Sequence, residues 1–213
     1  MKIDDKSHPQ VRTTATVLTM LDKLPVELRC AFGASCAERL YPMYRAFSID
    51  ASWGESERLR QAIDGLWAVA TLSSVNVEFS EESLLNLAPR SAEHKSRFTF
   101  AAQYAVSCVI HAWNAHGART SDQAAWCSVV SRDCISEYLQ WLTCPYYVNP
   151  NEQIRAETSA IDWFPHVLMQ HEVRKQLKDL ELLGSVPRLD EATAFTLRVA
   201  GARGIAPFER HLI

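Results

Sequence analysis

The sequence contains little glycine, with seven residues in a chain of 213. Sandwiches and barrels need many tight turns, which favour glycine, whereas helical proteins need few. No stretch of the chain alternates apolar and polar residues for long enough to predict a strand. The low glycine content and the missing strand pattern therefore favour an all-helical protein.

Long apolar runs are also missing from the sequence. None approaches the roughly 18 apolar residues that a membrane-spanning helix requires. The first ten residues, MKIDDKSHPQ, contain no apolar core of a secretory signal. The six cysteines form no CxxC motif, and most fall in helical apolar patterns, where a free cysteine behaves as a small hydrophobic residue. We therefore expect a cytoplasmic protein with reduced thiols and no membrane association.

The chain has no run of lysine or arginine, and its formal net charge is −3. Nucleic-acid-binding proteins usually carry a basic face, so this charge argues against nucleic acid as a partner. The sequence also lacks a glycine-rich phosphate loop, a GxSxG nucleophile motif and the HxE…CxxC pattern of zinc deaminases. The common motifs of phosphate binding and hydrolysis are therefore absent.

Metal-binding patterns are equally weak. His166 and His171 are five residues apart, which places them about 140° apart around a helix. Cys108 and His111 share a helix face, but two ligands do not close a zinc site. The sequence therefore predicts no metal and no cofactor, and its mid-helix cysteines are poor candidates for nucleophiles.

The apolar residues recur with the period of an α-helix along most of the chain. This spacing predicts a single-domain bundle of seven or eight mostly antiparallel helices. We expect the helical domain to span residues 1–184, and residues 185–213 to form a helical tail docked on it. The expected helices cover 11–24, 25–47, 56–72, a short helix from Ser80 that ends at Pro89, 91–116, 120–143, 152–163, 166–183 and a short segment from Asp190 to Val199.

The stretch Leu24–Leu72 is central to this prediction. Its first helix is expected to carry one apolar stripe, from Leu28 to Phe47, and to begin with Pro25 at its first position. Pro42 lies inside this helix and has no N–H to donate to the Glu38 carbonyl. We therefore expect the helix to break or kink at Pro42 and to end in a loop over residues 48–54.

Several segments of the chain carry a family resemblance. They are AERLYPMYRAF, LRQAIDGLW, the alanine-rich region 91–116 and HVLMQHEVRKQLKDLELL. In these segments Glu38, Arg39, Pro42 and Tyr44 match an ER-x2-P-x-Y pattern, and Val167 stands where the corresponding pattern has proline. The chain resembles the YjaG-like bacterial proteins, a domain-of-unknown-function family numbered 416, over about residues 24–184. The resemblance implies an all-helical fold and no particular activity, and the tail 185–213 looks like an addition to the family's usual length.

Two interpretations of the adjacent charges at Glu38 and Arg39 remain open. The favoured interpretation is structural: buried ion pairs with Asp64 or Glu172 on neighbouring helices that fix how the helices pack. The other is an interhelical polar pocket that binds a small molecule or catalyses a reaction. Its residues would be Glu38, Arg39, Tyr44, Asp64 and Glu172.

Aromatic and acidic residues in predicted loops and turns suggest a surface for a protein partner. The candidates are Trp53, Glu55, Glu78, Glu81, Glu82, Tyr146 and Tyr147. Together with the lack of catalytic motifs, they favour a non-enzymatic protein-interaction module. One concrete form is an immunity protein that binds and neutralises a bacterial toxin domain. A homodimer is also compatible with the helical pattern, which does not distinguish faces buried within a monomer from faces buried between two.

Overall fold

The described part of the chain folds into α-helices connected by turns and loops. The computed structural model describes residues 8–72, 79–118, 121–143 and 161–203. Within these ranges there are eight helices and no strand, so the predicted all-α bundle is confirmed. The helices are α1 (Pro9–Leu21), α2 (Val26–Asp50), α3 (Ser56–Ala70), α4 (Glu81–Leu85), α5 (Thr99–Ala118), α6 (Ser121–Thr143), α8 (Val167–Gly184) and α9 (Glu191–Arg203).

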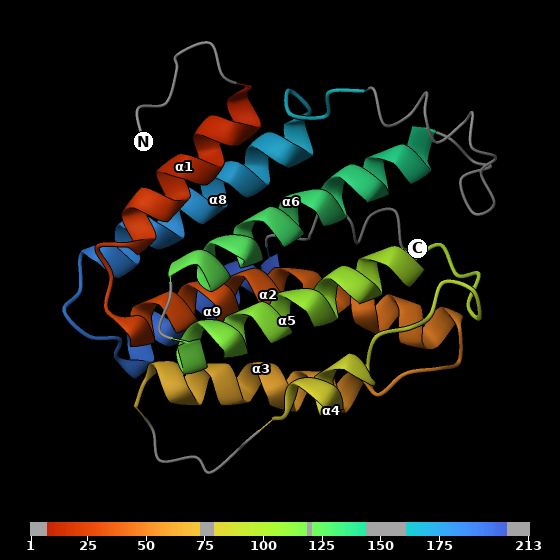
Figure 1. Ribbon diagram of the computed structural model, residues 1–213, viewed down its shortest axis with the longest axis horizontal. Coiled ribbons are helices and arrows are strands. Elements are labelled where there is room, and N and C mark those ends of the chain that lie inside the picture. The colour runs from red at the N-terminus through yellow and green to blue at the C-terminus, as the bar shows by residue number, and fades with distance from the viewer. Residues whose placement is uncertain (1–7, 73–78, 119–120, 144–160, 204–213) are drawn as a thin grey trace.

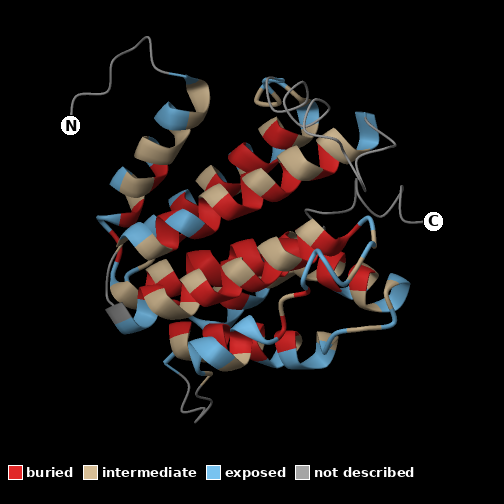
Figure 2. Ribbon diagram, turned by 45° about the vertical axis from the view of Figure 1, so that its right-hand side comes forward, coloured by how far each residue is buried: buried red, intermediate tan, exposed pale blue. Residues whose placement is uncertain are grey.

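Helix α2 lies at the centre of the bundle. It packs against α3, α5, α6, α8 and α9, and these helices surround it (Figure 1). The pairs α2–α3 and α5–α6 run antiparallel, as the colours of Figure 1 show. Buried residues line the inner faces of the surrounding helices, and exposed residues lie on the outside of the bundle (Figure 2).

The predicted apolar stripe of α2 is buried, but the middle of this helix is also buried on its other sides, which the stripe did not predict. Every residue from Cys30 to Leu40 is buried, including Ser35, Glu38 and Arg39. A helix surrounded by neighbours needs no polar face. The charged side chains of α2 therefore point into contacts with other helices, where each needs a partner.

Helix α2 also continues through Pro42, contrary to the expected break. It is helical from Val26 to Asp50, so the predicted loop at 48–54 starts later, at Ala51. Pro25 lies just before the helix as its N-cap and does not occupy its first position. The packing of α2 against five neighbouring helices explains this result, because tertiary contacts outweigh the local cost of one proline.

The turn between α2 and α3 is held by Tyr44. Its buried hydroxyl donates to the carbonyl of Leu87 at 2.8 Å and accepts from the backbone N–H of Glu55 at 3.3 Å. Gly54 has a φ of 98°, and a Cβ at this position would lie 3.0 Å from the Tyr44 hydroxyl oxygen. A residue without a side chain is therefore favoured there, both by backbone conformation and by space.

Helices α2 and α5 approach closely at Gly33. A Cβ added to Gly33 would lie 2.7 Å from the Cβ of Ala112, which is shorter than any ordinary contact. The small residues on both helices therefore set this distance. The alanine-rich face predicted for region 91–116 does pack against a neighbour, but the helix begins only at Thr99 because residues 91–98 form turns and loop.

Helix ends agree better with the sequence. Ser80 caps α4 by accepting from the N–H of Ser83 at 3.1 Å, and Asp190 caps α9 by accepting from Thr193 at 2.7 Å. His166 caps α8, so Val167 takes the first helical position, where the resembled pattern has proline. The expected helix at 152–163 lies mostly outside the described residues, and 161–163 are not helical.

Helix α9 packs on α2 through a small residue. Gly201 faces Glu38, where an added Cβ would lie 3.0 Å from the Glu38 Cβ. The apolar residues Leu189, Ala194 and Leu197 are buried and anchor the same segment. This contact brings α9 beside α3 as well, and the two helices form the walls of the site described next.

Candidate functional site

Glu38 and Arg39 are neighbours in the sequence but belong to two different polar networks. Because successive residues of a helix point about 100° apart, Arg39 faces α8 and Glu38 faces α3 and α9. The favoured structural interpretation of these charges agrees with their contacts, since each forms ion pairs with neighbouring helices. The two networks differ in burial and in access to the surface.

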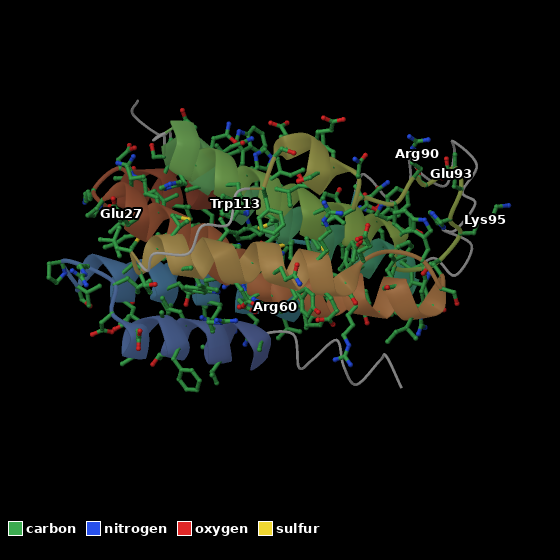
Figure 3. All side chains as sticks on the ribbon, turned by 90° about the horizontal axis from the view of Figure 1, so that it is seen from below. Glu27, Arg60, Arg90, Glu93, Lys95 and Trp113 are labelled. Atoms are coloured by element: carbon green, nitrogen blue, oxygen red, sulfur yellow. The ribbon has the colours of Figure 1, made fainter. Side chains whose placement is uncertain are left out.

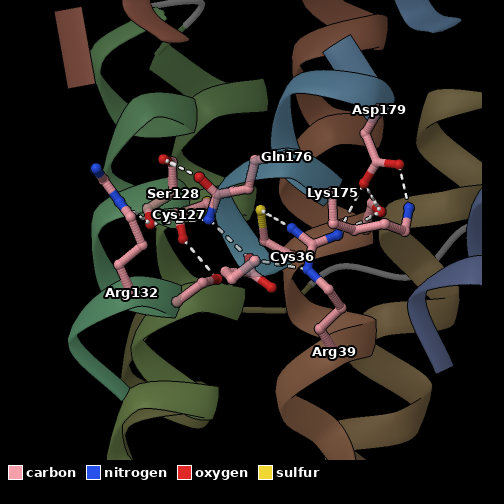
Figure 4. Close-up of polar contacts among 11 residues, drawn as sticks. Cys36, Arg39, Cys127, Ser128, Arg132, Lys175, Gln176 and Asp179 are labelled. Carbon is pink, nitrogen blue, oxygen red and sulfur yellow. Dashed lines mark hydrogen bonds and ion pairs between the residues drawn. The ribbon is translucent and has the colours of Figure 1, made fainter. Parts of the chain in front are cut away.

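The Arg39 network is buried between α2 and α8 (Figure 4). The guanidinium donates to Glu172 at 3.0 Å and to Asp179 at 2.8 Å, and only 1% of the Arg39 side chain is exposed. It also donates to the Ser35 hydroxyl at 3.0 Å and contacts the Cys36 sulfur at 3.1 Å. Arg39 therefore pairs with two carboxylates of α8, and Lys175 of the same helix is a second cation beside Asp179.

Further polar contacts extend this network to α6 (Figure 4) and to α1. The Gln176 side chain donates to Glu172 at 2.7 Å and accepts from the Ser128 hydroxyl at 2.6 Å. The buried Arg132 guanidinium donates to the Ser128 carbonyl at 3.2 Å and to the Thr14 hydroxyl at 2.7 Å. Four helices are thus joined by a continuous set of hydrogen bonds.

The electrostatics of this network fit a structural role. Burial alone would lower the pKa of the Arg39 guanidinium, but Glu172, Cys36 and Asp179 outweigh it and raise the pKa above its ordinary value. For the Cys36 and Cys134 thiols, burial raises the pKa, because it favours the neutral form, and both thiols stay neutral. Neutral buried thiols are poor nucleophiles, because the thiolate is the reactive form.

The Glu38 network lies nearer the surface. The Arg60 guanidinium of α3 donates to both Glu38 carboxylate oxygens, at 2.7 and 2.8 Å, and the Trp67 indole N–H donates to the same carboxylate at 2.9 Å. Arg198 of α9 pairs with Glu38 at 3.2 Å and also with Asp64, which in turn lies 3.0 Å from Arg60. Two carboxylates and two guanidinium groups thereby join α2, α3 and α9.

A groove of about 660 Å³ opens above this second network, between α3 and α9. We call it the α3–α9 groove. Figure 3 shows Arg60 at the same place, between these two helices. The residues that line the α3–α9 groove are Glu38, Asp64, Trp67, Ala68, Thr71, Glu191, Ala194, Phe195, Arg198, Val199 and Ala202.

The α3–α9 groove combines apolar walls with a few charged groups at its base. Phe195 lines it with 68% of its surface exposed, and Leu72, next to the lining residue Thr71, is 58% exposed. Small side chains such as Ala68 and Ala202 leave the space between the helices open. An apolar cleft with convergent polar groups is the usual form of a binding site.

The residues predicted as a polar pocket do not form one site. Glu38 and Asp64 line the α3–α9 groove together. Arg39 and Glu172 lie in the buried network, and Tyr44 holds the α2–α3 turn. The prediction that all five share one pocket is therefore wrong, because adjacent positions on α2 face different neighbours.

Four of the predicted partner-binding residues lie in the described part of the chain. Trp53 is only partly exposed and packs against Phe47 and His94, with ring centroids 5.9 and 4.7 Å apart. Glu55, Glu81 and Glu82 are exposed, the first before α3 and the others on α4. Glu78, Tyr146 and Tyr147 lie outside the described residues. Binding of a partner by these residues remains a prediction.

Sequence reasoning did not include Arg60, Trp67, Arg198 and Phe195 in the site. Arg60 and Asp64 are four residues apart, a spacing that indicates an ion pair on one helix face. The sequence predicted only a docked tail for the region of α9, and this prediction did not indicate a wall of a site. Nothing in the sequence places Arg198 against Glu38, since the two are 160 positions apart. The groove is therefore a product of the tertiary fold.

Two features of the described part of the chain bear on other functions. No helix in those residues is both long and apolar enough to cross a membrane. No three His, Cys, Asp or Glu side chains among them are grouped so as to hold a metal ion.

Fold and groove define an all-α bundle with a surface cleft. The chain belongs to the family described as "Protein of unknown function (DUF416)", whose model matches residues 16–203. The match extends past 24–184 at both ends and includes α9, so both walls of the α3–α9 groove fall within the family region.

A solved structure supports the fold. The chain is similar to the crystal structure of a DUF416 family protein from Shewanella baltica OS155, with a TM-score of 0.69 and 19% sequence identity. The similarity covers 86% of this chain and 92% of that one. No protein with a curated description matches the chain. At this identity the likeness shows the shared fold alone.

Proposed function

We propose that the protein is a non-enzymatic binding module that takes up an amphipathic helix of a partner protein in the α3–α9 groove. The observation that carries the proposal is Phe195, which is 68% exposed beside an apolar groove of about 660 Å³. Burying apolar surface gains about 25 cal/mol per Å², so exposed apolar clefts with polar rims favour association.

The shape of the groove supports a helix as its occupant. Its walls are two neighbouring helices, and small residues on both, including Ala68 and Ala202, leave the middle open. An amphipathic helix inserts apolar side chains at successive turns into such a groove. Phe195 and Leu72 would then pack against those apolar anchors and lose their contact with water.

Charge supports a basic residue beside the apolar anchors of the partner. Glu38, Asp64 and Glu191 line the groove, and Arg60 and Arg198 pair with the first two, so Glu191 adds one excess negative charge. The whole chain also has a net charge of −3. Opposite charges speed encounter and select among partners. An immunity protein that neutralises a basic toxin domain is one concrete form of this proposal.

Photo-crosslinking in the host cell tests the proposal. A photoreactive phenylalanine analogue replaces Phe195, and the matched control places it at Ala192, which is exposed on α9 but does not line the groove. We expect one protein to crosslink at position 195 and not at 192. Adding Ala68→Trp, which fills the groove, should abolish that adduct. No adduct, or an adduct that persists with Ala68→Trp, would contradict the proposal.

A small molecule is the second candidate occupant. The groove volume falls within the range of about 300–1,000 Å³ that is usual for ligand pockets, and Glu38, Asp64 and Arg198 converge at its base. Native mass spectrometry of the purified protein distinguishes the two. A discrete added mass that disappears with Ala68→Trp favours the small molecule, and a bare protein mass favours the partner helix.

A further inference from the structure

A second hollow lies further along α2, where its C-terminal half meets the segment before α5. Its volume is about 350 Å³, and its lining residues are Pro42, Arg45, Ala46, Ile49, Asp50, Arg97 and Phe98. None of these lines the α3–α9 groove. We propose that this hollow, named here the Arg45–Arg97 hollow, binds a small organic anion: a carboxylate or phosphate monoester with an apolar body.

The depth of the hollow follows from the sequence of α2. Positions 42, 45, 46 and 49 lie on one face of the helix, one turn after another. Pro42 and Ala46 have short side chains, and the side chains of Arg45 and Ile49 beside them are longer, so this face of the helix has a depression. The ring of Phe98 forms part of the facing wall. The proline that does not break α2 therefore helps to shape a space beside it.

The two arginines give the hollow its charge. Arg45 forms no ion pair with any carboxylate in the described ranges, and neither does Arg97. The lining carboxylate of Asp50 already accepts a hydrogen bond from the Ser96 hydroxyl at 2.6 Å. Two guanidinium groups against one carboxylate leave a positive site in a chain whose net charge is −3.

Arg97 is oriented by aromatic stacking. Its guanidinium carbon lies 4.6 Å from the centroid of the Phe98 ring and 5.4 Å from that of Trp141. Stacking uses the flat face of the guanidinium and leaves the N–H groups at its edge free to donate. Guanidinium edges bind carboxylate and phosphate oxygens through paired hydrogen bonds. Arg97 is thus preorganised for an anion.

The remaining lining defines the rest of the ligand. Pro42, Ala46, Phe98 and the 71% exposed Ile49 offer apolar contact next to the two cations. A bare inorganic anion would leave this apolar surface uncovered, and a neutral apolar molecule would leave both arginines without a counter-charge. An anion on an aromatic or aliphatic body satisfies both parts. Hence the ligand class is an amphiphilic organic anion of modest size.

Titration calorimetry with four probes tests the proposal: phenyl phosphate, benzoate, benzyl alcohol and inorganic phosphate. We expect phenyl phosphate or benzoate to bind at least about tenfold more tightly than benzyl alcohol and inorganic phosphate, since only the first pair meets both halves of the hollow. Preference between the first two identifies phosphate or carboxylate as the natural head group. No binding of either at millimolar concentration, or equal binding of benzyl alcohol, would overturn the proposal.

Variants locate the binding. Arg45→Gln and Arg97→Gln should each weaken the preferred probe by about tenfold or more, because each removes charge-assisted hydrogen bonds. Ala46→Trp fills the hollow and should abolish binding. The control is Arg90→Gln, whose exposed side chain pairs with Glu93 at 3.2 Å outside the hollow. The three arginine substitutions change exposed side chains and should keep the melting temperature of the wild type. Equal loss in the control would refute the site.

Discussion

The guanidinium Nε of Arg39 on α2 lies 3.0 Å from a carboxylate oxygen of Glu172 on α8, and both side chains are buried. Arg39 and Glu172 are 133 positions apart in the chain, so this contact joins two distant helices. Arg39 also pairs with Asp179, so its removal would leave Glu172 without its ion-pair partner and Asp179 with Lys175 as its counter-charge. The pair therefore determines how α8 sits on α2.

Replacing this guanidinium should destabilise the protein severely. Arg39→Met keeps much of the volume but leaves the charges of Glu172 and Asp179 buried, at a cost of about 3–5 kcal/mol. Urea unfolding followed by circular dichroism measures the change. The control is Arg58→Gln, since Arg58 is exposed and lies 3.6 Å from Glu55, a pair worth under about 1 kcal/mol. Similar losses in the two variants would contradict a structural role for the network.

The close approach of α2 and α5 predicts opposite effects for two glycine substitutions. Gly33→Ala places a Cβ 2.7 Å from the Ala112 Cβ and should destabilise by about 1–3 kcal/mol. Gly117→Ala meets nothing within 4 Å in the last turn of α5 and should stabilise by about 0.5–1 kcal/mol. Thermal unfolding compares them. Equal melting temperatures would show that the two helices are not so closely packed.

Cys30 predicts a specific dependence of stability on pH. Burial, helped by Glu27, raises the pKa of the Cys30 thiol from 9.0 to about 12. Its contribution to the free energy of unfolding is complete below about pH 9, because the thiol is then protonated in both states. As pH rises from about 9 to 12, only the unfolded state releases its proton, and this contribution is lost.

The measurement compares wild type with Cys30→Ala in denaturant titrations between pH 7 and pH 10. The alanine variant lacks the titrating group, so its stability should fall less steeply above about pH 9. Parallel pH profiles would contradict the raised thiol pKa. Alkylation provides a second readout: the buried cysteines Cys30, Cys36, Cys108, Cys127 and Cys134 should react only after unfolding.

The sequence predicted the fold more accurately than the site, for physical reasons visible in single elements. Helices such as α3 and α8 lie near their expected bounds because their periodicity and flanking polar residues are local. Residues 91–98 carry a similar local pattern yet are not helical, and the Ser96 hydroxyl, which donates to Asp50, ties this segment to α2. Contacts of that kind depend on distant residues.

The site follows the same rule. Glu38 and Asp64 were predicted to act together, and they do line the same groove. Their partner Arg198 and the exposed Phe195 come from α9, whose place beside α3 depends on the Gly201 contact with Glu38. A single sequence does not reveal such a contact. The sequence shows the charged residues, but it does not show the α3–α9 groove that the fold forms beside them.

Binding of the partner to groove variants tests the proposed function most directly. The crosslinked helix of the partner, made as a peptide, is titrated into wild type, Ala68→Trp and the surface control Ala192→Trp by calorimetry. We predict that Ala68→Trp weakens binding at least about thirtyfold, as expected for a central contact, while Ala192→Trp stays within about twofold of wild type. Equal affinity for all three proteins would contradict the assignment of the α3–α9 groove as the binding site.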